Sequence, residues 1–184
     1  GRAGAAASLL VATVFLSAPP PEARQNQTAP SDPEAKLAAL GIQLPPPSVP
    51  IANYVKAVRA GNLVFLAGHG PAKGSGEMIA GKVGRDLTIE QGYDAARLTA
   101  VGLLATLKAE IGDLRKVKRI VRLFGLVNAV DGFTQHPEVI NGASDLLVEV
   151  FGDRGKHARA AVGAASLPRN IAVEIEMVVE VAGE

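Results

Sequence analysis

Residues 159–177 read RAAVGAASLPRNIAVEIEM. This stretch places one arginine before a run of small apolar residues, then a Leu-Pro turn, then an alternating strand that carries Glu174 and Glu176. A guanidinium is a planar, permanently charged fork that binds a carboxylate through two parallel hydrogen bonds. We expect the two strands to form a hairpin, which would bring Glu174 near whatever Arg159 holds. The alternative is a plain ion pair between the two residues.

Length and charge bound the remaining possibilities. The chain has 184 residues and a net charge of +1, which suits one domain with an additional segment. Proteins that bind nucleic acid usually carry a clustered excess of Lys and Arg. The densest basic run, residues 115–122, is interpreted as a solvated strand face. We therefore do not expect a nucleic-acid partner.

Cysteine and histidine usage limits the chemistry. The absence of cysteine excludes disulfides, thiolate metal sites and a cysteine nucleophile. The three histidines, His69, His136 and His157, are far apart and show no metal-ligand spacing. We therefore do not expect a metal site.

The N-terminal third differs in composition from the rest. Residues 1–18 contain an apolar run of signal-peptide length, too short for a membrane span. A membrane anchor or a misplaced start are the alternatives. Residues 19–36 are polar and proline-rich and predict a disordered linker, and residues 37–184 predict one domain. We expect a periplasmic or secreted protein, or a cytoplasmic one if the start is misplaced.

The domain shows a regular order of elements. Thr88 and Gln91 form a capping box, and apolar residues at helical spacing follow as far as Gly112. Pro137 suits the first turn of a second helix. The glycine-rich residues 68–76 lack a lysine-serine ending, so a phosphate-binding loop is not indicated. The pattern predicts an α+β fold with both helices on one face of a sheet. Its strands are expected at 54–58, 63–67, 117–127, 158–165 and 171–181, with a short strand or turn at 81–84, and its helices at 34–40, 88–111 and 138–151.

Two motifs carry a family resemblance. The first is R-(small)-x-V-x4-LP-x4-VEIE, starting at Arg159, and the second is Y-x6-GNLVF, at 54–65. With them, the chain resembles the reactive-intermediate deaminase family, also called Rid, YjgF-like or endoribonuclease L-PSP, over about 37–181. The stretches LAGHGP, GKVGRDLT and VINGASDLLVEVFG are similar to the branch that carries an N-terminal extension.

The resemblance implies both a fold and an activity. Its members are homotrimers with a chorismate-mutase-like fold, in which the sheets pack into a central barrel and the active sites lie between subunits. It implies a metal-free hydrolase of the 2-iminobutanoate/2-iminopropanoate deaminase type, which needs neither a metal nor an organic cofactor. Such an enzyme converts reactive enamine and imine acids, such as 2-aminoacrylate, into a 2-keto acid and ammonia.

The resemblance also implies residue roles. Arg159 would grip the substrate carboxylate, Glu174 would activate the attacking water, and Tyr54 would line the cleft. Asn141 would lie near the substrate, although a helix-capping role is an equal alternative. Glu176 shares the strand face of Glu174, with no assigned role.

The LAGHG segment departs from the family pattern. It would bring Gly68 and His69 to the substrate, but His69 stands where many relatives have glutamine. Ala67 stands where many have serine, which puts turnover of 2-aminoacrylate in question while carboxylate binding is retained. A trimer that binds small carboxylates without turnover is therefore the first alternative. RNA binding or cleavage ranks last, because the sequence shows no cluster of aromatic residues for base stacking.

Overall fold

The computed structural model describes residue 1 and residues 32–47, 49–50 and 52–183. The elements that follow Tyr54 alternate as expected, two strands, a helix, a strand, a helix and two strands. A short helix precedes them. In chain order the elements are α1 Pro33–Ala39, β1 Ala57–Ala60, β2 Leu63–His69, α2 Ile89–Ile111, β3 Val117–Asn128, α3 His136–Phe151, β4 Ala158–Ala164 and β5 Val173–Val181.

Helix α2 begins and ends where its sequence predicts. The Thr88 hydroxyl accepts a hydrogen bond from the Gln91 amide, and the Gln91 side chain accepts one from the Thr88 amide. These reciprocal bonds satisfy donors that the first helical turn leaves free. Gly112 ends the helix with φ of 80°, a backbone conformation that favours glycine.

Helix α3 lies against α2 at very close range. Pro137 occupies its first turn, as predicted. Gly142 lies so near α2 that an added Cβ would overlap the carbonyl of Tyr93 and stand 3.0 Å from the amide of Arg97. Only glycine therefore allows this helix crossing.

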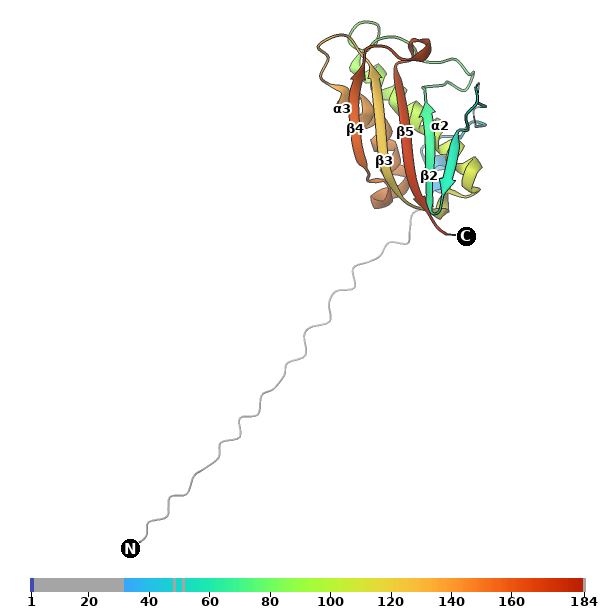
Figure 1. Ribbon diagram of the computed structural model, residues 1–184, viewed down its shortest axis with the longest axis vertical. Helices are drawn as coiled ribbons and strands as arrows, with labels where there is room; N and C mark the ends of the chain where they lie inside the picture. The colour runs from blue at the N-terminus through green and yellow to red at the C-terminus, as the bar shows by residue number, and fades with distance from the viewer. Residues whose placement is uncertain (2–31, 48, 51, 184) are drawn as a thin grey trace.

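The five strands form one mixed sheet in the order β1-β2-β5-β3-β4 (Figure 1). Strand β3 runs parallel to β4, and every other neighbouring pair is antiparallel. The expected hairpin of β4 and β5 is wrong, because β3 lies between them and pairs with both. A parallel pair needs a long crossover, which α3 supplies between β3 and β4.

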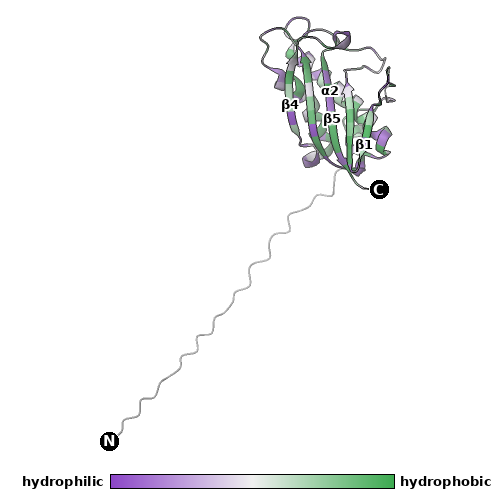
Figure 2. Cartoon of the chain, in the orientation of Figure 1, coloured by the Kyte–Doolittle hydropathy of each residue, from purple (hydrophilic) through white to green (hydrophobic). Residues whose placement is uncertain are grey.

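Both long helices cover the same face of the sheet, which confirms the predicted α+β architecture (Figure 1). Strand β5 shows the consequence. Its odd-numbered residues, 173 to 181, are buried beneath the helices. Its even-numbered residues, including Glu174, Glu176 and Val178, point to the other side, which we call the open face. In Figure 2 the strands carry both hydrophobic and hydrophilic residues along their length.

A bulge interrupts the pairing of β2 with β5. Leu66 pairs with Met177, but His69, three residues on, pairs with Ile175, only two residues back along β5. One extra residue in a strand reverses the faces of those that follow it. Gly68 therefore lies over Glu174 on the open face, while His69 turns toward the helices.

The remaining differences from the sequence prediction are local. Strand β1 starts at Ala57, so Tyr54 precedes the strand. Of the expected strand or turn at 81–84, Val83 forms isolated bridges to Leu87 and Ala129, and a turn begins at Gly84. Helix α1 starts at Pro33, and Glu34 pairs with Lys108 of α2 at 2.7 Å, so the folded unit begins before residue 37. The predicted export signal and most of the predicted linker lie outside the described residues. No helix in the described part is long and apolar enough to cross a membrane.

Candidate active site

Arg159 lies on the edge strand β4 and reaches back to the helix layer. Its partner in the register is Leu123, which is fully buried under the helices, so both side chains share the covered face. The Arg159 Nη1 donates to Asn141 Oδ1 at 2.7 Å and to Ser144 Oγ at 3.0 Å. Two neutral acceptors on α3 thus orient an exposed guanidinium whose charge stays available for an anion.

Asn141 and Ser144 are one turn apart on α3, which places their side chains on one face of the helix. Asn141 is the sixth residue of α3, and Gln135 is the N-cap. The alternative capping role of Asn141 is therefore wrong. Its position beside Arg159 is the one that the family motif implies.

Ser144 and His157 were missed by sequence reasoning. Ser144 Oγ lies 3.1 Å from His157 Nε2, and His157 Nδ1 lies 2.6 Å from the Gly155 carbonyl. The signal was a serine three residues after Asn141 on a predicted helix and a histidine two residues before Arg159 at strand spacing. The histidines were compared only with metal-ligand spacings, and this pattern is not one of them.

Glu174 lies on the open face, in register with Leu126 and next to Gly68. An added Cβ at Gly68 would overlap the carboxylate, so glycine is required for this side chain to lie where it does. Burial, and then the nearby Glu176, raise the pKa of Glu174, while Lys56 opposes them. A carboxyl group with a raised pKa is suited to exchange protons near neutral pH.

Tyr54 and Lys56 lie at the same end of the sheet as Glu174. The Lys56 ammonium stands 5.3 Å from the centre of the Tyr54 ring, a cation–π contact. Lys56 also acts electrostatically on Glu174. Lys56 was not among the sequence candidates, although its spacing of two from Tyr54 was visible.

His69 is not brought together with Gly68 and Glu174. It is 5 % exposed, with Nδ1 at 2.7 Å from the Ala67 carbonyl and Nε2 at 2.8 Å from Thr106 Oγ1. Because a carbonyl can only accept, Nδ1 carries the proton and Nε2 accepts from the threonine hydroxyl. Burial lowers the pKa of His69 to about 4. This histidine is therefore a neutral part of the interior.

Arg159 and Glu174 do not meet within one chain. They lie on opposite faces of the sheet, and β3 separates their strands. Neighbouring strands are about 4.8 Å apart, so the two backbones are about 10 Å apart before the faces are considered. The alternative of an ion pair between them is therefore wrong. One small ligand cannot contact both within a single protomer.

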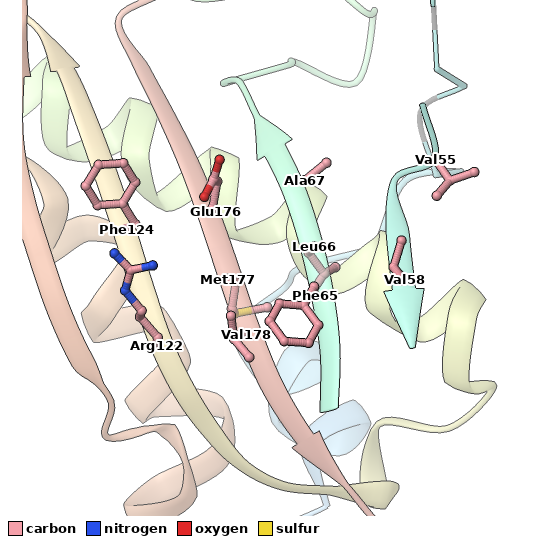
Figure 3. A pocket seen from close by; sticks show the side chains of 10 residues that line it. All are labelled: Val55, Val58, Phe65, Leu66, Ala67, Arg122, Phe124, Glu176, Met177 and Val178. Carbon is pink, nitrogen blue, oxygen red and sulfur yellow. The ribbon is translucent and has the colours of Figure 1, made fainter. Parts of the chain in front are cut away.

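The open face of the sheet, which carries Glu174, is apolar and contains a pocket. Val58, Phe65 and Val162 are 53 %, 46 % and 42 % exposed. A pocket of about 310 Å³ lies over β2, β5 and β3, with Phe65 on one side and Phe124 on the other (Figure 3). Arg122 lies 5.2 Å from the centre of the Phe124 ring. Such an uncovered apolar sheet face marks an interaction surface.

The described residues contain no group of three or more His, Asp or Glu side chains that could hold a metal ion. The charged groups described above include the exposed Arg159 guanidinium and the Glu174 carboxyl group with its raised pKa.

Comparison with known proteins gives consistent matches over this domain. The chain is 43 % identical to Protein TCP17 of Trypanosoma cruzi over 147 residues, 79 % of this chain and 92 % of that one. It is 30 % identical over 134 residues, 71 % of this chain and 87 % of that one, to a 2-iminobutanoate/2-iminopropanoate deaminase of Dermatophagoides farinae.

A solved structure agrees in fold. The protein Atu1372 of unknown function from Agrobacterium tumefaciens is 45 % identical, with a TM-score of 0.76, covering 82 % of this chain and 94 % of that one. A family model described as "YjgF/chorismate_mutase-like, putative endoribonuclease" matches residues 34–181. The sheet, its two helices and these matches together place the chain in the YjgF/chorismate mutase-like family.

Proposed function

We propose that the protein is a hydrolytic deaminase of small enamine and imine acids, with an active site completed between two copies of the chain. One observation carries this proposal. Arg159 is held by neutral acceptors on α3 and the pKa of Glu174 is raised, yet the two side chains lie on opposite faces of one sheet. A neighbouring copy packed on the open face would bring its own Arg159 edge toward Glu174 of the first.

The character of the open face supports such packing. Its exposed apolar side chains and its pocket have no cover in the described part of the chain. Covering them would remove apolar surface from water, at about 25 cal/mol for each Å². The family resemblance implies a homotrimer, so three sheets would surround a central axis with their helices outside.

The proposed reaction is hydrolysis of an imine acid, R–C(=NH)–COO⁻. Arg159 holds the carboxylate through two hydrogen bonds and fixes the imine carbon in place. Glu174 takes a proton from a water molecule as its oxygen attacks that carbon, which gives a tetrahedral carbinolamine. The protonated Glu174 returns that proton to the carbinolamine nitrogen, which becomes an amino group. Glu174 then accepts the hydroxyl proton as the C=O bond forms and delivers it to the nitrogen as the C–N bond breaks, so that ammonia and the 2-keto acid leave. No atom changes its oxidation state overall.

A second candidate, binding of a 2-keto acid without turnover, has one observation in its favour. Ala67 offers no hydroxyl beside Gly68, and His69 is turned into the interior. Fewer polar groups then surround Glu174, which would slow proton transfer while Arg159 still binds the carboxylate.

A coupled assay separates the two candidates. A serine/threonine dehydratase generates 2-aminoacrylate or 2-iminobutyrate, and trapping with semicarbazide reports how fast the imine disappears. We expect the wild-type protein to accelerate its loss. Glu174→Gln should lower the rate at least about a hundredfold, because the general base is removed. Arg115→Ala is the control, since Arg115 is exposed, pairs with its near neighbour Asp113 and lies in the turn before β3.

Arg159→Ala tests the carboxylate role in the same assay. Loss of turnover with an unchanged circular dichroism spectrum would support the deaminase. If the wild-type protein does not accelerate imine loss but binds a 2-keto acid in an Arg159-dependent way, the binding protein is the better description. If neither occurs, both candidates fail.

A further inference from the structure

A chain of hydrogen bonds leads from the protein backbone to the guanidinium of Arg159. It starts at the Gly155 carbonyl, passes through His157 and then the Ser144 hydroxyl, and ends at Arg159 Nη1. The donor–acceptor distances along it are 2.6, 3.1 and 3.0 Å. Its members come from the turn after α3, from the start of β4 and from α3 itself.

The donor and the acceptor of each hydrogen bond in this series can be assigned. The Gly155 carbonyl can only accept, so His157 Nδ1 donates, and Nε2 of the neutral ring is left as an acceptor. The Ser144 hydroxyl must then donate to His157, which leaves its oxygen to accept from Arg159. Burial, and then the charge of Arg159, lower the pKa of His157 and favour the neutral ring that this arrangement needs, against the opposing hydrogen bond to Gly155.

The chain of hydrogen bonds holds one end of the Arg159 guanidinium. Among the described residues, the hydrogen bonds of Arg159 both use Nη1, toward Ser144 and toward Asn141. An exposed arginine would otherwise sample many rotamers, with a side-chain entropy of about 2 kcal/mol. Fixing Nη1 on the α3 side leaves the other N–H groups of the fork to meet a carboxylate.

We propose that Ser144 and His157 are positioning residues, which hold the Arg159 guanidinium in the orientation that binds the substrate carboxylate. This inference rests on the proposed function, because it takes Arg159 as the carboxylate-binding residue. Neither residue touches the substrate in this proposal.

Paired substitutions test it. Ser144→Ala removes the hydroxyl and Ser144→Thr keeps it. His157→Asn keeps a donor at the Nδ1 position but falls short of Ser144, whereas His157→Gln places an amide oxygen near the Nε2 position. We expect Ser144→Ala and His157→Asn to raise KM about fivefold with kcat within about twofold, because hydrogen bonds to a charged group contribute modestly at an exposed site. The threonine and glutamine variants should stay near wild type.

Two results would overturn the proposal. One is an equal KM for the alanine and threonine variants of Ser144, and the other is a fall in kcat at unchanged KM. Circular dichroism and the elution volume of each variant guard against misfolding.

A measurement that needs no turnover separates this proposal from the proposed function. NMR of the Arg159 side chain reports how fast the guanidinium rotates about its Nε–Cζ bond. Slow rotation in the wild type and in Ser144→Thr, with fast rotation in Ser144→Ala, is the expected result. Equal rotation in all three would refute the positioning chain even in an active enzyme. An inactive wild type that binds no keto acid, with the expected rotation pattern, would instead refute the proposed function.

Discussion

The two faces of the sheet are formed by the same five strands but differ in their surroundings, since helices cover one face and leave the other exposed. On β5, Ile175 and Met177 are buried under α2 and α3, while Glu174 and Glu176, their immediate neighbours, face outward. The covered face is closed by elements of its own chain, and the open face carries exposed apolar residues, a pocket and a carboxyl group with a raised pKa. One strand can therefore provide stability with alternate residues and chemistry with the residues between them.

The largest expected effect lies on the covered face. Gly142→Ala should lower the free energy of unfolding by about 3 kcal/mol or more, because the added Cβ meets the backbone of α2, which cannot move aside cheaply. Gly102→Ala on α2 is the matched control, with its closest contact at 3.8 Å. It should be neutral or add up to about 1 kcal/mol, since alanine favours a helix over glycine. Urea unfolding measures both, and equal stabilities would contradict the close helix contact.

The next effect concerns His69, which the bulge assigns to the covered face. Its pKa is about 4 in the fold and about 6.5 in the unfolded chain, so the unfolded chain binds more protons between these values. The contribution of neutral His69 to the free energy of unfolding should therefore be complete above pH 6.5. The wild-type free energy of unfolding should fall by about 3 kcal/mol as the pH drops toward 4. His69→Gln should show a shallower fall in the same urea titrations. Identical pH profiles would mean that the histidine is not held neutral in the interior.

Gly68→Ala tests the residue on the other side of the bulge. The new Cβ would overlap the end of the Glu174 side chain, which can swing away, so the free energy of unfolding should change by no more than about 1 kcal/mol. The deaminase rate should fall about tenfold or more, because the proton-transfer group is displaced. Gly74→Ala, with no atom within 4 Å of its Cβ, is the control in the coupled assay. Full activity of the Gly68→Ala variant would show that the position of Glu174 does not matter for the reaction.

The smallest effect on the fold itself is expected from Phe65→Asp on the open face. Phe65 is 46 % exposed in the single chain, so its loss removes little from the core. A charge there should instead prevent copies from packing, which light scattering after size exclusion would show as a monomer with an unchanged circular dichroism spectrum. A variant that stays fully associated would place the contact between copies elsewhere.

Local features of this fold could be predicted from the sequence. The capping box of Thr88 and Gln91 and the ending of α2 at Gly112 both rest on interactions between near neighbours in the chain. The family motif likewise indicated Arg159, Asn141, Glu174 and Gly68. Asn141 does contact Arg159, and Gly68 does contact Glu174.

The relations between distant segments could not be predicted from the sequence pattern. Strand periodicity gives no information on which strands are neighbours, so β4 and β5 were expected to pair, although β3 lies between them. A bulge of one residue left no clear mark, yet it decides that His69 faces inward and Gly68 outward. The contact of Ser144 with His157 depends on how α3 packs against the segment that leads into β4, so the local spacings of these two residues do not by themselves bring their side chains together.

The central place of β5 has a consequence for how the molecule is made. Among the five strands of this sheet, β5 comes last along the chain, and it lies between β2 and β3, which do not pair with each other. Until Val173–Val181 emerge, the nascent chain holds the β1–β2 hairpin and the parallel β3–β4 pair with its crossover helix, and the edges of β2 and β3 that β5 later covers are unpaired. The sheet can therefore close only once β5 has been made, and a chain that stops short of β5 is left as two separate halves.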